Sequence, residues 1–168
     1  MKKIIVLITA ITLLLAMSIC VFGAEPGYKP CEVNITVNGT AYTLLGYEVP
    51  GGQDGVKLRD IAYILNGTSK QFGVAFESGT VSITTGKPYT PMGTELAQYT
   101  GTEPSGFYSR HMFLLNGEYC AIEATLASDY NYVPLATFLY NSCGIIAIYN
   151  EDGSITIDTE IQLELDEH

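Results

Sequence analysis

The chain has few basic residues, and this shortage restricts its partners. Its 168 residues include 8 Lys and Arg against 18 Asp and Glu, a formal net charge of −10 at pH 7. Phosphate groups repel such a chain, so we expect neither nucleic acids nor anionic membrane surfaces as partners. The charge is typical of a soluble extracellular protein, and it would also suit calcium or a cationic partner.

Cysteines are also scarce. Beyond residue 23 only Cys31, Cys120 and Cys143 remain, and an odd number excludes complete internal pairing. One disulfide with one free thiol and no disulfide at all both stay open. No two of these cysteines have the Cys-x-x-Cys spacing of a redox or metal site, so a hydrophobic core must supply the stability.

The N-terminus has the layout of a secretory signal peptide. Lys2 and Lys3 precede an almost wholly apolar run over residues 4–20, and small residues follow it. We expect residues 1–23 to be removed and residues 24–168 to be secreted or held at the cell surface. An uncleaved membrane anchor is the alternative, although the apolar run is marginal in length for a membrane span. Cleavage leaves six basic and 18 acidic residues, a formal charge of −12.

Residues 33–86 have the pattern of two hairpins on either side of a short helix. Apolar and polar residues alternate at the start, as in a half-buried strand. Asn38-Gly39 is a strong hairpin signal, because both central residues of such a turn need positive φ. The expected elements are strands at 33–37 and 41–49, a helix over 58–65, and strands at 72–76 and 81–83.

Residues 111–160 repeat this order. Asn116-Gly117 is the same turn dipeptide. The separation between the turn and the following helix is also similar: 19 positions from Asn116 to Leu135, against 20 from Asn38 to Leu58. The expected elements are strands at 112–115 and 119–126, a helix that has Pro134 in its first turn, and strands at 144–149 and 154–157. We therefore predict a duplication, whose copies are joined by a Gly-, Pro-, Thr- and Tyr-rich linker over 87–110.

These elements predict an α+β fold of two β-β-α-β-β repeats, in which an antiparallel sheet packs on two short helices. Each helix is too short to be stable alone in water. Each repeat is also marginal as a separate domain, so we expect one domain over residues 24–168 with a shared core.

Arg59 and Asp60 are two opposite charges in an otherwise apolar stretch. The second repeat has Ala136 and Thr137 in their places. We interpret Asp60 as favouring the positive N-terminal end of its helix, and Arg59 as covering apolar surface with its stem. A catalytic pair present in one copy is the alternative.

Several stretches together resemble the copper amine oxidase N-terminal-like domain, also called the stalk domain. They are "VNGTAYTL", "VKLRDIAYIL", "LNGEYCAI", "YVPLATFLY" and "GSITI". The resemblance covers about residues 33–160 and implies a secreted protein of the Gram-positive bacterial type. Ala136 departs from the pattern, because the family usually has arginine there.

The resemblance implies the stalk fold without oxidase activity. In amine oxidases copper and the quinone belong to a separate, larger domain with three histidines and an Asn-Tyr-Asp/Glu motif. This chain has only His111 and His168, and Val133 follows Asn131-Tyr132. We therefore expect no catalytic residue, no cofactor and no metal ligand from the family.

Other candidate chemistry is weaker. Ser109 and His111 have no acid beside them that suggests a triad. Residues 150–153 lack the remaining ligands of a calcium loop and are typical of a turn. The acidic residues 158–167 are expected to be a solvated end.

Tyrosine is abundant, with 12 residues. Its rigid, amphipathic ring suits the binding of sugars or proteins. Tyr130, Asn131 and Tyr132 are the expected exposed ligand surface, and the alternative is that these tyrosines cover the edges of a thin core.

The sequence thus predicts a non-enzymatic module that binds or presents cell-wall polysaccharide or another surface protein. An unrecognised secreted hydrolase using exposed carboxylates is one alternative, and a purely structural spacer is another. A hydrolase should have a deep pocket with a perturbed carboxylate.

Overall fold

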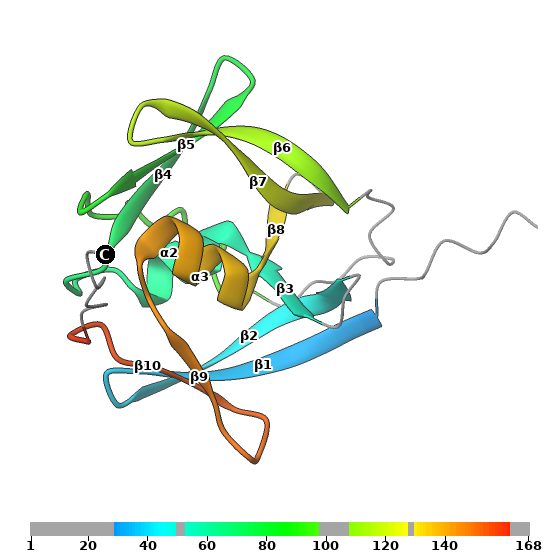
Figure 1. Ribbon diagram of the computed structural model, residues 1–168, viewed down its shortest axis with the longest axis vertical. Helices are drawn as coiled ribbons and strands as arrows, with labels where there is room; N and C mark the ends of the chain where they lie inside the picture. Colours follow the sequence, from blue (N-terminus) through cyan, green and yellow to red (C-terminus); the bar gives the residue numbers. More distant parts are fainter. Residues whose placement is uncertain (1–28, 50–52, 98–107, 128–129, 162–168) are drawn as a thin grey trace, which may run out of the picture.

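The computed structural model of the protein describes residues 29–49, 53–97, 108–127 and 130–161 (Figure 1). These residues are mostly β-structure, with ten strands in one mixed sheet and two short helices. The first repeat contributes β1 (Lys29–Val37), β2 (Thr40–Val49), β3 (Gln53–Lys57), α2 (Leu58–Ile64), β4 (Phe72–Glu77) and β5 (Thr80–Thr85). The second contributes β6 (Tyr108–Leu115), β7 (Glu118–Ala127), β8 (Tyr130–Pro134), α3 (Leu135–Cys143), β9 (Ala147–Tyr149) and β10 (Ile155–Ile157).

The prediction of an α+β fold with an antiparallel sheet is wrong. The sheet dominates the described structure and is mixed, because β1 pairs in parallel with β10 and β5 pairs in parallel with β6. Each helix is also preceded by a strand, β3 or β8, that was not predicted. The physical reason is that both parallel pairings join segments far apart in the chain, so no local pattern indicates them.

The sheet order is β4-β5-β6-β7-β8-β3-β2-β1-β10-β9. The last hairpin of each repeat pairs with the first strand of the other repeat: β5 pairs with β6, and β10 pairs with β1. The two halves of the sheet therefore have corresponding strands in the same order. β3 and β8 meet at the centre, where Val56 lies opposite Val133 and both side chains are fully buried. An approximate two-fold axis therefore passes between these two valines.

The exchanged hairpins are held by the two Asn-Gly turns. The N–H of Asn38 donates to the Ile157 carbonyl at 3.0 Å, and the N–H of Asn116 donates to the Ile83 carbonyl at 2.9 Å. Both asparagines have positive φ, 47° and 54°, as the sequence predicted for these turns. Each asparagine thus both turns its hairpin and continues a parallel strand pairing.

The side chains of these asparagines make matching contacts. The Oδ1 atom of Asn38 accepts from the N–H of Thr159 at 3.0 Å, and that of Asn116 accepts from the N–H of Thr85 at 2.9 Å. The same asparagine–threonine contact is therefore present in both halves. In each half the threonine lies two positions after the last paired residue of its strand, Ile157 or Ile83. These hydrogen bonds fix the register of each parallel pairing.

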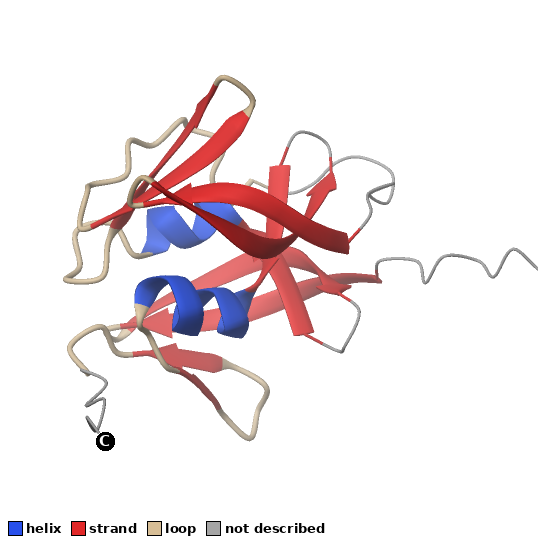
Figure 2. Ribbon diagram, turned by 45° about the horizontal axis from the view of Figure 1, so that its top comes forward, coloured by secondary structure: helices blue, strands red, loops and turns tan. Residues whose placement is uncertain are grey.

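The helices lie between the two arms of the sheet (Figure 2). α2 buries Leu58 and Ile61, and α3 buries Phe138 and Leu139. The Phe138 ring packs edge-on against Phe72 of β4, with centroids 5.6 Å apart, which joins the second repeat's helix to the first repeat's hairpin. Pairs of this kind contribute beyond the burial of their area.

The ends of α3 follow local sequence signals. Pro134 is the last residue of β8 and immediately precedes the helix, rather than lying in its first turn. Gly144 ends the helix with φ of 62°, and the next residue's N–H bonds back to the Leu139 carbonyl at 3.0 Å. This left-handed ending favours glycine, because a residue with a Cβ is strained at this positive φ.

Cys31, Cys120 and Cys143 are half-buried free thiols. Burial, together with the nearby carboxylate of Asp54, raises the pKa of the Cys31 thiol to about 12, and burial raises the pKa of Cys143 to about 12. Such thiols are unreactive near neutral pH, because the thiolate is the nucleophile.

Three sequence predictions concern segments outside the described residues: the signal peptide at 1–23, the middle of the linker, and the acidic end from 162 onward. Among the elements that the structure describes, neither helix has the length and apolar character needed to cross a membrane.

Candidate ligand-binding groove

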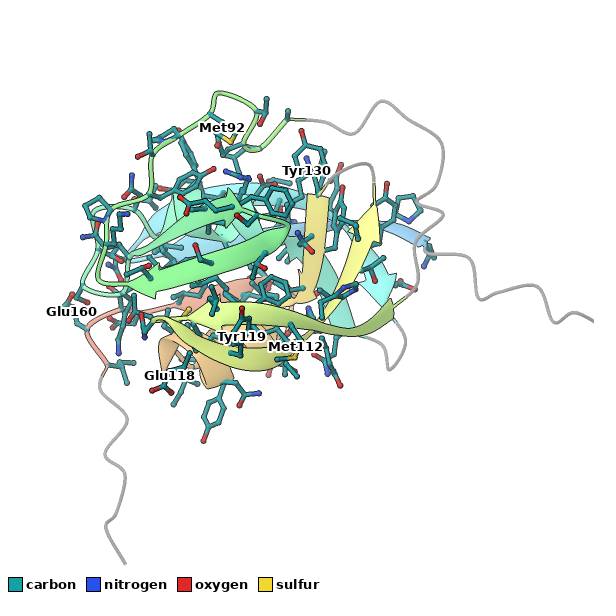
Figure 3. The ribbon with its side chains drawn as sticks, turned by 90° about the horizontal axis from the view of Figure 1, so that it is seen from above. Met92, Met112, Glu118, Tyr119, Tyr130 and Glu160 are labelled. Carbon is teal, nitrogen blue, oxygen red and sulfur yellow. The ribbon has the colours of Figure 1, made fainter. Side chains whose placement is uncertain are left out.

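A groove of about 440 Å³ lies between the start of α2 and the arm of the sheet formed by β4 to β8. We call it the β4–β8 groove. Tyr130 of β8 lines it, whereas the side chain of Met112 on β6 lies near Tyr119, on the opposite face of the strand from buried Phe113 (Figure 3). The described lining of the groove consists of Lys57, Leu58, Arg59, Val74, Ala75, Phe76, Gly79, Val81, His111, Met112, Phe113, Leu126, Tyr130 and Asn131. The volume lies within the range of known ligand sites.

The apolar wall of the groove is a row of side chains across three strands. Phe76 of β4 lies opposite Val81 of β5, and Val81 lies beside Phe113 of β6. Phe113 is buried, Val81 is half-buried and Phe76 is 64% exposed. Together with Leu126, which is 51% exposed, this row offers a ligand an apolar surface.

Basic side chains lie at the α2 end of the groove. Lys57 is only 4% exposed, and its Nζ donates to the Ala97 carbonyl at 3.1 Å and lies 5.0 Å from the centre of the Tyr130 ring. Arg59 uses its Nη1 to contact the Tyr89 hydroxyl at 3.4 Å. Neither side chain forms an ion pair with a carboxylate in the described ranges, where the recorded pair is Lys29–Glu48.

A strap at residues 88–97 crosses α2 beside the groove, and we call it the α2 strap. The backbone of Tyr89 exchanges two hydrogen bonds with the Asn66 side chain, each 3.0 Å. Lys57, Arg59 and Asp60 bind other points of the same strap. The strap therefore lies beside the groove and holds the two basic side chains in place.

Glu95 organises the strap from within. Its carboxylate accepts from the Tyr89 hydroxyl at 2.6 Å and from the N–H groups of Met92 and Gly93 at 2.8 and 2.9 Å. Burial raises the pKa of Glu95, but the hydrogen bonds from Tyr89 and from these backbone groups outweigh it and lower the pKa to about 2. The ionised carboxylate is thus part of the folded strap.

Asp60 binds the strap from the helix. It is 1% exposed, and its Oδ1 accepts from the N–H of Leu96 at 3.2 Å, while its Oδ2 has no hydrogen-bond partner among the described residues. Burial raises the pKa of Asp60, against the Leu96 hydrogen bond and nearby Lys57. Asp60 does lie in the first turn of α2, but its principal contact is the strap, and a buried carboxylate here is costly.

The strap explains why Arg59 and Asp60 have no charged counterparts in the second repeat. Ala136 and Thr137 occupy those places in α3, where no described segment crosses the helix in the same way. From the sequence, Asp60 was assigned to the helix end and Arg59 to apolar surface, and their contacts with residues 88–97 were not predicted.

The structure separates the three residues of the predicted ligand surface. Tyr130 and Asn131 are half-buried and line the groove. Tyr132 is only 1% exposed, and its ring packs edge-on against Tyr47 with centroids 5.2 Å apart. Tyr132 is therefore not part of an exposed surface.

Sequence reasoning missed most of the groove lining. Phe76, Met112 and Leu126 come from three strands that the pairing brings together, and His111 was considered only as a partner for Ser109. The residues at 150–153 form the β9–β10 turn, where Asp152 accepts from the N–H of Ser154 at 2.9 Å. Within the described ranges, no three His, Cys, Asp or Glu side chains are placed to hold a metal ion.

Comparisons with protein-family models, with curated proteins and with solved structures gave no match to this chain. The likeness to the stalk domain therefore rests on the sequence motifs alone.

Proposed function

We propose that this chain is a non-enzymatic, stalk-type binding module that is secreted or displayed at the cell surface, with the β4–β8 groove as its ligand site. The observation that carries the proposal is the groove itself, which combines an apolar wall with a few polar side chains at one end. Ligand sites commonly have this composition.

The lining supports binding over hydrolysis. The described lining residues include no carboxylate, serine or cysteine. Of the three described carboxylates with a shifted pKa, Asp60 and Glu95 are engaged by the α2 strap, and Asp152 lies in the β9–β10 turn. A glycosidase-like mechanism would need two carboxylates facing the substrate, so the alternative of a secreted hydrolase gains no support from this groove.

Two ligand classes fit a module of this kind, cell-wall polysaccharide and another surface protein. Tyr130 and Asn131 offer a ring and an amide that suit a sugar. Phe76 and Leu126 suit a protein partner, because large apolar side chains are common anchors at protein interfaces. A spacer without a ligand is the second reading, and it predicts that the groove binds nothing.

Co-sedimentation with purified Gram-positive cell envelopes tests the proposal. One portion of the envelopes is treated with protease before use, so that polysaccharide remains and surface proteins are lost. We expect saturable pelleting of the wild type that weakens in Phe76→Ala and Asn131→Ala but not in Tyr140→Ala. Tyr140 is a matched control, because it is 55% exposed on α3 and lies outside the groove lining.

Absence of pelleting with either preparation would contradict the binding proposal and favour the spacer. Pelleting that all three variants retain would place the binding surface elsewhere.

A further inference from the structure

The approximate two-fold axis supplies an internal comparison for the groove. The row Phe76–Val81–Phe113 corresponds to a row in the other arm, in which Tyr149 lies opposite Ile155 and Ile155 lies beside Ile35. The two rows have the same strand positions and the same apolar character. The apolar wall therefore belongs to the fold of both halves.

The basic side chains of the groove have no basic counterparts in the other arm. α2 begins at Leu58 and α3 at Leu135, so equivalent residues in and before the helices differ by 77 positions. The corresponding pairs are Lys57 and Pro134, Arg59 and Ala136, Tyr130 and Gln53, Asn131 and Asp54, and, from the paired rows, His111 and Val33. All three basic residues of the groove are replaced by uncharged ones, and the other arm has an acid at Asp54.

The fold therefore does not require basic residues at these places, because the same architecture forms without them. Lys57 and Arg59 lie at the α2 end of this groove in a chain with a net charge of −10, and the neighbouring carboxylates of Asp60 and Glu95 are bonded to the α2 strap. Part of the role of the two basic side chains is to hold the α2 strap. The strap engages Arg59 through Nη1, which leaves Nε and Nη2 without a hydrogen bond to the described residues.

We propose that the β4–β8 groove binds an acidic, apolar segment of a partner protein, with a carboxylate at Arg59 and large apolar side chains on the row Phe76–Val81–Phe113. This inference rests on the proposed function and names its ligand class. A guanidinium binds a carboxylate through charge-assisted hydrogen bonds, which are strong where solvent access is limited. Lys57, which is 4% exposed and bonded to the Ala97 carbonyl, adds a second positive charge at the same end.

A peptide fits the groove better than a sugar. Phe76 and Leu126 are 64% and 51% exposed, and together they present two large apolar side chains to a ligand. Sugar hydroxyls would lose water there without gaining hydrogen bonds. β4 is also the terminal strand of the sheet, so the groove reaches an edge from which an extended segment can enter.

Three peptides separate the two parts of the recognition. The first is acetyl-Leu-Phe-Glu-Glu-amide, the second has Gln in place of both Glu, and the third has Ser in place of Leu and Phe. Each is titrated into the purified protein, and binding is followed by amide and methyl chemical shifts in NMR spectra. We expect the first peptide to shift signals of Arg59, Phe76 and Leu126, and to bind roughly tenfold more tightly than either of the others.

Variants of Arg59 test the anion site itself. Arg59→Gln should weaken binding of the Glu peptide by roughly tenfold and leave binding of the Gln peptide unchanged. Arg59→Lys should restore part of the preference, because it returns the charge without the planar fork. Since Arg59 also contacts the strap, the Gln peptide reports any general damage to the groove.

Equal binding of the Glu and Gln peptides would overturn the anion inference and leave the binding function standing. Groove shifts with polygalacturonate but with none of the peptides would overturn the peptide assignment in favour of an acidic polysaccharide. If no peptide or polysaccharide shifts groove signals while envelopes still pellet the protein, the inference fails and the proposed function survives at another surface.

Discussion

Replacing Glu95 by glutamine tests whether the α2 strap is held by an ionised carboxylate. In the folded protein the pKa of Glu95 falls from its ordinary 4.5 to about 2, because its hydrogen bonds from Tyr89 and the strap backbone outweigh burial. The full shift corresponds to about 3 kcal/mol. Glu95 retains contact with water, which screens the interaction, so we expect Glu95→Gln to lower the free energy of unfolding at pH 7 by about 1–2 kcal/mol.

The pH dependence has a definite sign. A carboxylate with a depressed folded-state pKa stabilises the fold above its ordinary pKa, and this stability is lost as the pH falls. The contribution of Glu95 is therefore complete well above pH 4.5 and disappears as the pH falls through about 2. The difference between wild type and Glu95→Gln should shrink steadily over this range.

Urea unfolding at pH 7, 5 and 3, followed by far-UV circular dichroism, measures this difference. Glu118→Gln is the matched control, because Glu118 is an exposed carboxylate at the start of β7 and lies away from the strap (Figure 3). We expect the control to change stability by less than about 0.5 kcal/mol. A Glu95→Gln protein as stable as the wild type at pH 7, or equally destabilised at every pH, would refute the reasoning.

Three further predictions follow from buried groups. Asp60→Ala removes the acceptor for a strap N–H and should cost about 1–3 kcal/mol in urea unfolding; Asp60→Asn keeps the acceptor and removes the buried charge. Because burial raises the pKa of Asp60, its charge opposes folding at neutral pH, so Asp60→Asn should melt above the wild type at pH 7 and lose this gain toward pH 3. Phe138→Ala should destabilise by about 3–5 kcal/mol in the same assay, since the ring is 2% exposed, and a cost below about 1 kcal/mol would argue against its packing on β4. Iodoacetamide at pH 8 should leave Cys31 and Cys143 unmodified in the native protein and label both in urea, as read by mass spectrometry; rapid native labelling would contradict the raised pKa of these thiols.

Sequence patterns predicted those parts of the fold that depend on residues close together in the chain. The Asn38-Gly39 and Asn116-Gly117 turns were predicted because their positive φ values need those residue types, and the short helices because their apolar residues recur at helical spacing. The ending of α3 at Gly144 has the same kind of local cause. In these cases the residue type and the backbone conformation are directly coupled.

The exchange of hairpins between the repeats could not be read from the sequence. β5 beside β6 and β10 beside β1 join segments whose apolar patterns would suit pairing within their own repeat equally well. β3 and β8 were missed because each is short and is followed directly by a helix, so its period merges with that of the helix. Strand pairing is decided by packing of the whole sheet, which local propensity does not record.

The candidate site was predicted in part. Tyr130 and Asn131 do line a groove, but Tyr132 is covered by Tyr47, a residue 85 positions earlier that the sheet brings against it. The charges at Arg59 and Asp60 were singled out correctly as unusual, yet their partners lie in the strap at 88–97. Polar contacts between a helix and a distant loop depend on the fold and leave no spacing signal.

The most direct test of the central claim, that the β4–β8 groove is the binding site of a non-enzymatic module, is the pelleting of wild type and Phe76→Ala with cell envelopes before and after protease treatment. The account predicts saturable pelleting of the wild type with untreated envelopes, and its loss both in the variant and after protease treatment. Pelleting that Phe76→Ala retains in full, or an absence of pelleting by the wild type, would contradict the account.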